Sequence, residues 1–312
     1  WMPIPPHLHP ARQTRPIEGG GFLLKEGGPS TRGLCGRGLC GAADAPRFRL
    51  FLTVSPPRIS PPRMSAPSSS SSSDGMRINK YIAHAGVCSR RDADTLVEQG
   101  RVQVDGQTVT QHGTRVHEGQ RVTVDGDEVY PLEFEYVLLN KPKDTISTTE
   151  DPKGRQTVLE AIGVPDDNPS GLFPVGRLDR NTTGVLLVTN DGDLAHRLMH
   201  PRFEIPKIYY VRAQARVKPH QLDRLERGVE LEDGPAAADQ VAYLDPTTKT
   251  DIALELHEGR NRQIRRMMEA LGHDIVQLER AKYADLSLGR LQRGDWRRLQ
   301  PHEDRELYTS VD

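Results

Sequence analysis

The sequence predicts an α+β protein whose folded part follows a long segment of low complexity. The first 75 residues hold 12 of the 24 prolines, and after them short helix patterns lead into two Val-x-Val-Asp-Gly repeats. Beyond residue 133, strand and helix patterns follow one another without the regular β-α-β succession that indicates a parallel sheet. We therefore expect a small module of two helices and short strands, then a larger domain with a mixed, mostly antiparallel sheet flanked by helices.

Residues 1–75 form the low-complexity leader. They contain 10 of the 28 glycines and end near the six-serine run 68–73. Such a segment cannot bury enough apolar surface to offset the entropy of ordering, so we expect it to be disordered. Its nine basic residues against four acidic ones leave a contact with RNA as the alternative. Because residue 1 is Trp and Met76 precedes the first periodic sequence, a mis-assigned start is a further alternative for part of the leader.

Composition places the chain among proteins of the cytoplasm. The 312 residues have a formal net charge of -1, and residues after 75 carry 33 basic and 39 acidic side chains, so any RNA binding must rest on local patches. The three cysteines give no disulfide framework or metal-ligand spacing, which fits a reducing compartment. No apolar run approaches 18 residues, so we expect no membrane span.

The segment 76–132 carries the signals of the small module. Apolar residues at i, i+3 and i+4 from Ile78 predict a first helix. Ser89 is a plausible N-cap for a second helix, which Gly100 ends. Residues 102–106 and 122–126 each run a valine alternation into an Asp-Gly turn, which is typical of a β-hairpin.

The segment 133–312 predicts the larger domain. Proline at position 142 ends the first strand, because it lacks a donor and restricts the residue before it. Asp191 and Gly192 turn another strand into a helix that stops before Pro201. We expect strands over residues 136–139, 185–188, 207–217 and 252–256, and helices over residues 192–199, around 222–225, and over 264–271.

Asp179 is the centre of the densest group of polar residues, the turn 176–184. It stands between Arg177 and Arg180, and nearby opposite charge favours the ionised carboxylate. An ionised aspartate in a loop before a buried strand can act as a nucleophile or stabilise developing positive charge. The alternative is that Asp179 only caps a turn.

Tyr209 lies in the alternating stretch 207–217. Period two places it on the same face as Val211, Ala215 and Val217, with Tyr210 and Arg212 on the other face, so Tyr209 points into the protein. An inward tyrosine often serves only as core. Beside a pocket, however, its ring can stack on an extruded base.

Residues 259–267 contain four arginines and no acid. On a helix with Ile264 and Met267 facing inward, Arg265 lies at the edge of the apolar face and can reach in, whereas Arg266 points away. Clustered arginines suit phosphate contacts, and a solvated basic face is the alternative.

Taken together, these motifs resemble one bacterial family. Residues 76 to about 130, with their motifs at 78–82, 89–93 and 100–106, resemble an S4 RNA-binding domain. The later motifs resemble, in the right order, the ribosomal pseudouridine synthases of the RsuA/RluB/RluE/RluF type; they are Asn140-Lys141-Pro142, 176–184, Lys207-Ile208-Tyr209 and 259–267. Residues 198–201, with Glu204 and Lys207, look closer to the RluB branch, which modifies large-subunit rRNA.

The resemblance implies roles for individual residues. Asp179 is the expected essential aspartate, Tyr209 the ring that stacks on the target base and assists proton transfer, and Arg265 the partner of the Asp179 carboxylate. Arg177 looks like the arginine that enters the RNA stack when the uridine flips out. The further expected RNA contacts are Lys141, Arg260, Arg262, Arg77, Lys80, Arg90, Arg91 and Arg101.

The implied reaction is an isomerisation that uses neither cofactor nor metal, in which the N1–C1′ bond of uridine breaks and C5 joins C1′. We expect a cytoplasmic monomer that acts on 23S rRNA or on an intermediate of large-subunit assembly. A 16S rRNA synthase, a non-catalytic S4 protein that only binds rRNA, and a nucleoside glycosyl hydrolase remain alternatives. The last does not account for the S4 module, and binding alone needs neither the carboxylate nor the inward tyrosine.

Overall fold

The computed structural model describes residues 75–311. The predicted disorder of the leader, its possible contact with RNA, and Cys35 and Cys40 concern residues 1–74, which lie outside the described residues. None of the helices in the described range is long and apolar enough to cross a membrane.

The first module combines two helices with short strands, as the sequence predicts. The side chain of Ser89 accepts a hydrogen bond from the Asp92 amide at 3.3 Å, which confirms the predicted N-cap. The strand order is β3-β2-β5-β6, and β1 pairs with β4. The elements are β1 (Met76–Arg77), α1 (Ile78–His84), α2 (Arg90–Glu98), β2 (Val102–Val104), β3 (Gln107–Val109), β4 (Arg115–Val116), β5 (Val122–Val124) and β6 (Asp127–Glu128).

Both Asp-Gly pairs form the predicted hairpin turns. Asp105 and Gly106 have φ values of 51° and 79°, and Asp125 and Gly126 have 53° and 93°. Two successive residues with positive φ define the type I′ turn, whose twist matches that of the flanking strands. The valines that alternate with polar residues in β2 and β5 are buried against the two helices, so the sequence pattern fixes the core of the module.

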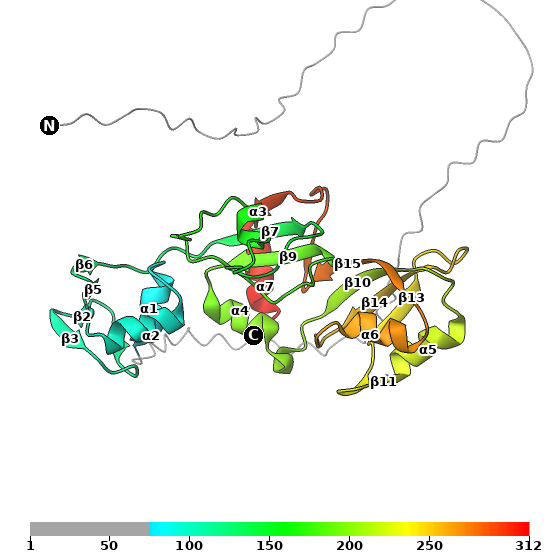
Figure 1. The fold of residues 1–312 in the computed structure, drawn as a ribbon, viewed down its shortest axis with the longest axis horizontal. Helices are drawn as coiled ribbons and strands as arrows, with labels where there is room; N and C mark the ends of the chain where they lie inside the picture. Colours follow the sequence, from blue (N-terminus) through cyan, green and yellow to red (C-terminus); the bar gives the residue numbers. More distant parts are fainter. Residues whose placement is uncertain (1–74, 312) are drawn as a thin grey trace, which may run out of the picture. The chain divides into compact units, whose positions relative to one another are not determined.

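The second module is built on one nine-stranded sheet (Figure 1). Its main path is β13-β14-β10-β15-β9-β7-β17, with β16 beside β15 and β8 beside β9. Every pairing is antiparallel except that of β15 with β9, which confirms the α+β prediction. The strands are β7 (Tyr136–Lys141), β8 (Phe173–Pro174), β9 (Thr183–Thr189), β10 (Lys207–Ala213), β13 (Gln240–Tyr243), β14 (Asp251–Leu256), β15 (Ile275–Tyr283), β16 (Leu286–Ser287) and β17 (Trp296–Arg298).

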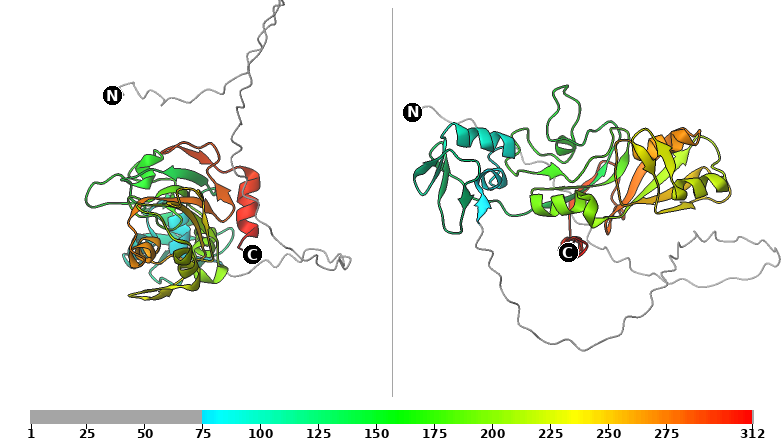
Figure 2. Two further views of the ribbon diagram at one scale, coloured as in Figure 1. Left: turned by 90° about the vertical axis from the view of Figure 1, so that its right-hand side faces the viewer. Right: turned by 90° about the horizontal axis from the view of Figure 1, so that it is seen from below.

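Helices cover the two ends of this sheet separately. Helices α5 (Pro219–Arg227) and α6 (Gln263–Ala270) pack their apolar faces on β10 and β14, and a small hairpin of β11 (Val229–Leu231) and β12 (Gly234–Ala236) joins the same core. Helices α4 (Gly192–Met199) and α7 (Pro301–Thr309) pack on β7 and β9. Figure 2 shows α7, in red, standing to one side of the sheet. The short helix α3 (Val158–Ala161) and the 3₁₀ turn η1 (Pro201–Phe203) complete the domain.

The large sheet differs from the sequence prediction in several strands, because β8, β13, β16 and β17 were not predicted and two others differ in ways that matter for the site. The stretch 207–217 is a strand only to Ala213, because β14 begins at Asp251 and β15 at Ile275, so no neighbour remains to extend the ladder. The sequence also gave no prediction for β15, although β15 is central. Its buried positions include Arg280, a charged residue that breaks the apolar alternation by which a strand is recognised.

Candidate active site

Asp179 lies in the turn that enters β9, at the point where β9 pairs with β15. The Thr182 amide donates to the Asp179 carbonyl at 3.0 Å, which closes the turn. The hydroxyl of Ser147 lies 3.1 Å from the carbonyl oxygen of Leu178 and accepts from the Leu178 amide at 3.2 Å. Leu178, the residue before Asp179, thus has a buried side chain and a backbone held by a neighbouring loop, and the Asp179 carboxylate itself is about one-third exposed.

Lys141 supports this turn from inside the protein. Its side chain is fully buried, and its ammonium group donates to the carbonyls of Pro142, Arg180 and Thr182 at 3.0, 3.1 and 3.0 Å. Lys141 was predicted from the sequence to contact RNA. That prediction does not fit this position, because all three donors are used inside the fold and none faces solvent.

We expect Lys141→Met to lower the free energy of unfolding by about 3 kcal/mol, because it leaves three inward carbonyls without their donor. Urea denaturation measures this change. The matched control is Lys143→Met, two residues on and exposed, which should change stability by less than about 0.5 kcal/mol. Equal stability of the two variants would contradict the supporting role of Lys141.

The same lysine predicts a pH dependence. Burial lowers the pKa of Lys141 from 10.5 to about 8. Between pH 8 and 10.5 the unfolded chain keeps a proton that the folded chain has lost. The free energy of unfolding therefore rises with pH across this window, and the gain is lost again as pH falls to about 8. The difference in unfolding free energy between the wild type and Lys141→Met should therefore widen between pH 8 and 10.5.

Asp179, Tyr209 and Arg265 line one cavity of about 90 Å³. Arg265, on α6, places its Nε 3.5 Å from Oδ2 of Asp179, and its side chain is only 15% exposed. The half-buried ring of Tyr209 packs on apolar residues of both halves of the sheet. The structure thus brings together three side chains from three separate motifs. Leu256 and Leu278 form an apolar part of the cavity wall.

This arrangement suits the chemistry of a planar, polar ring. A carboxylate that lines such a cavity can act as a nucleophile or as a base. An aromatic side chain and leucines in the same cavity can stack on a base and exclude water, which strengthens electrostatic interactions inside.

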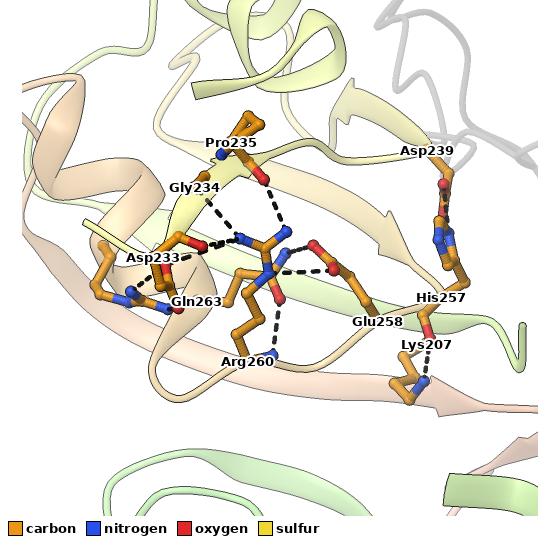
Figure 3. A network of polar contacts seen from close by, with 10 residues as sticks. Lys207, Asp233, Gly234, Pro235, Asp239, His257, Glu258, Arg260 and Gln263 are labelled. Carbon is orange, nitrogen blue, oxygen red and sulfur yellow. Dashed lines mark hydrogen bonds and ion pairs between the residues drawn. The ribbon is translucent and has the colours of Figure 1, made fainter. Parts of the chain in front are cut away.

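Arg260 is anchored in the protein rather than free for RNA, as Figure 3 shows. Its guanidinium donates to the carbonyls of Gly234 and Pro235 at 3.2 and 2.7 Å and to Glu258 at 3.3 Å. The Gln263 side chain in turn bonds both Glu258 and the Arg260 amide. The predicted RNA contact of Arg260 therefore does not fit its position, because its donors already fix the loop that leads into α6.

Lys207, at the start of β10, holds the same loop before α6 through a hydrogen bond. Its ammonium group donates to the carbonyl of His257 at 2.7 Å (Figure 3). It also donates to the carbonyl of Ile205 at 2.8 Å. Burial lowers its pKa to about 8. Lys207 thereby links the strand that carries Tyr209 to the loop that precedes Arg265.

The remaining predicted RNA contacts lie at the surface. Arg262 is the N-cap of α6, with φ at 48°, and lies 3.7 Å from Glu269. Lys80 forms an ion pair with Asp193 at 2.6 Å, and Arg101 pairs with Asp125. Four residues are exposed and have no hydrogen bond or ion pair from their side chains within residues 75–311: Arg77, Arg90, Arg91 and Arg177.

Several residues of the cavity were not predicted from the sequence. Leu278 comes from a strand for which no role was predicted, Glu258 lies beside a recognised motif, and Thr182 belongs to a recognised motif but had no predicted role. Ser147, which holds the Leu178 backbone beside the cavity, was not predicted either. The one available signal was the acidic residue Glu258, which directly precedes the stretch 259–267 with its four arginines.

Comparison with known proteins gives consistent matches. The family model described as RNA pseudouridylate synthase matches residues 135–270, and that of the S4 domain matches residues 76–126. The chain is 44% identical over 240 residues to ribosomal large subunit pseudouridine synthase B of Bacillus subtilis, which covers 76% of this chain and 97% of that protein. It is 39% identical over 234 residues to the protein of the same name from Yersinia pestis, which covers 72% of this chain and 73% of that protein. A crystal structure described as a pseudouridylate synthase superposes with a TM-score of 0.54 and 28% identity, covering 75% of this chain and 100% of the other.

Proposed function

Because the chain belongs to the RNA pseudouridylate synthase family, whose members are isomerases, we propose that it converts a specific uridine of 23S rRNA to pseudouridine. The observation that carries the catalytic part of this proposal is the cavity that joins Asp179, Tyr209 and Arg265. The choice of 23S rRNA is supported by similarity along nearly the whole length of a large-subunit synthase.

In the proposed reaction Asp179 is the catalytic carboxylate. The target uridine leaves the RNA helix, which costs a few kcal/mol of unstacking, and its base enters the cavity against the ring of Tyr209. The N1–C1′ bond then breaks, the uracil turns, and C5 bonds to C1′ while the C5 proton is lost and N1 regains one. Every atom of the product comes from the uridine and water, so the reaction needs no external donor of electrons or groups.

Arg265 and Tyr209 have supporting parts in this scheme. The guanidinium of Arg265 lies beside the Asp179 carboxylate, 3.5 Å from Oδ2, and partners it from the inner side. Tyr209 stacks on the uracil and assists the proton transfers. Arg177, exposed two residues before Asp179, is placed to fill the gap that the flipped nucleotide leaves in the stack.

The first module, residues 76–132, is proposed to add affinity rather than target choice. The exposed Arg77, Arg90 and Arg91 offer phosphate contacts, and such contacts weaken steeply with salt. Target choice then depends on the RNA structure around the cavity, where Arg262 also lies.

Pseudouridine mapping of 23S and 16S rRNA tests the proposal. The RNA is taken from a strain that lacks this gene, complemented with the wild type or with Asp179→Asn. We expect one 23S uridine to lose its modification and only the wild type to restore it. Loss of a 16S site instead would move the protein to the small-subunit enzymes, and unchanged maps of both RNAs would contradict the proposed rRNA substrate.

A further inference from the structure

One hydroxyl in the catalytic cavity has no partner in the folded protein. Five threonines are buried in the described part of the chain, and four of them use their hydroxyls in hydrogen bonds, for example Thr183 to the Leu278 carbonyl and Thr189 to the Glu135 carbonyl. The exception is Thr182, which is 2% exposed and whose Oγ1 lacks any partner within residues 75–311. Native folds rarely tolerate an enclosed hydroxyl without a partner, so this one calls for a reason.

The backbone holds Thr182 firmly beside Asp179. Its amide donates to the Asp179 carbonyl, and its own carbonyl accepts from the ammonium group of Lys141, both at 3.0 Å. The first and fourth residues of such a turn have Cα atoms less than about 7 Å apart. Because the backbone is fixed, the χ1 rotamer, one of three staggered positions, decides where the Thr182 hydroxyl points.

The Asp179 carboxylate is itself weakly held. Its one polar contact within the described residues is Nε of Arg265 at 3.5 Å, a longer distance than that of a strong charge-assisted hydrogen bond. An ionised carboxylate has about four acceptor positions. A group that must meet a reacting atom in one orientation gains rate when its non-reacting oxygen is fixed.

We propose that Thr182 is a positioning residue for Asp179. When the target nucleotide fills the cavity, the Thr182 hydroxyl turns and donates to one oxygen of the Asp179 carboxylate, which leaves the other oxygen directed at the nucleotide. The inference rests on the proposed function of Asp179. It accounts for both observations at once, because the orphan donor and the under-bonded acceptor lie in the same turn and line the same cavity.

The test compares Thr182→Val and Thr182→Ser in the full chain, acting on a transcript that contains the mapped target uridine. Valine keeps the shape and removes the hydroxyl, so we expect kcat to fall by about ten- to a hundredfold, the value of a hydrogen bond to a charged group. KM should stay within about twofold, because the bond is made to the enzyme and not to the RNA. Serine keeps the donor and should restore kcat to within about threefold of the wild type.

Stability provides the matched control. Thr182→Val should melt at the wild-type temperature or above it, since a methyl group replaces an unpartnered hydroxyl. Thr189→Val, at the other end of β9, removes a hydroxyl that donates to the Glu135 carbonyl at 2.6 Å, so it should melt lower while kcat is unchanged. These opposite patterns separate a positioning role from a structural one.

Three results would overturn the proposal: wild-type kcat in Thr182→Val, a serine variant as slow as the valine variant, or a change in KM alone, which would mean that the hydroxyl binds the RNA. A wild-type chain that modifies no rRNA would count against the proposed substrate instead. The same comparison is then made on the cellular RNA that the wild type does modify.

Discussion

Asp179→Asn is expected to reduce pseudouridine formation by on the order of 10⁴-fold, because the amide keeps the shape of the side chain but can neither attack nor remove a proton. RNA affinity should stay within about threefold, since the contribution of the carboxylate arises in the transition state. Single-turnover assays measure the chemical step, and equilibrium binding at fixed salt measures the affinity.

The matched control is Asp144→Asn. Asp144 is an exposed carboxylate near the same loop, 3.2 Å from Arg180, but it does not line the cavity. We expect its variant to react at the wild-type rate. A clearly active Asp179→Asn enzyme, or equal losses in the two variants, would exclude Asp179 as the catalytic carboxylate.

Gly184→Ala is expected to destabilise the protein by about 3–5 kcal/mol. A Cβ at this position would lie 2.2 Å from the carbonyl oxygen of Arg280 and 2.8 Å from its amide nitrogen, and φ is +107°, which an alanine rarely adopts. Both clashing atoms belong to the backbone of β15, so relief requires breaking the pairing of Arg280 with Gly184 that joins the halves of the sheet. Chemical denaturation measures the loss.

Gly192→Ala is the control for this substitution. Gly192 begins α4, has no positive φ, and has open space where a Cβ would lie. Alanine there should be neutral or slightly stabilising, because it favours a helix more than glycine does. If Gly184→Ala were as stable as Gly192→Ala, the close approach of β9 to β15 would not be a requirement of the fold.

Local signals in the sequence were reliable where neighbouring residues decide the outcome. The cap of Ser89 and the two Asp-Gly turns formed as predicted, because each depends on a few adjacent residues. The inward face of Tyr209 and Val211 also followed from the period of two. The same rule failed for Ala215, which is exposed, since the neighbouring strands end before it.

Charge was the least reliable guide to residue roles. Lys141 and Arg260 were predicted to bind RNA because they are basic residues in motifs of an RNA enzyme, yet both donate to backbone carbonyls inside the fold. Whether a basic side chain faces solvent or is buried depends on backbone carbonyls from segments far away in the sequence, which can accept its hydrogen bonds. No pattern around Lys141 marks the approach of Arg180 and Thr182.

The sequence by itself determined the fold class, the helices and hairpins of the first module, and the three motifs that contain Asp179, Tyr209 and Arg265. Only the tertiary structure decided that these motifs share one cavity, because β15 lies between β9 and β10 and brings the turn of Asp179 next to α6. The physical reason is the separation along the chain between the residues that interact. Turns, caps and alternation depend on interactions within a few residues, whereas the parallel pairing of β15 with β9 and the burial of Lys141 arise from contacts between segments far apart in the chain.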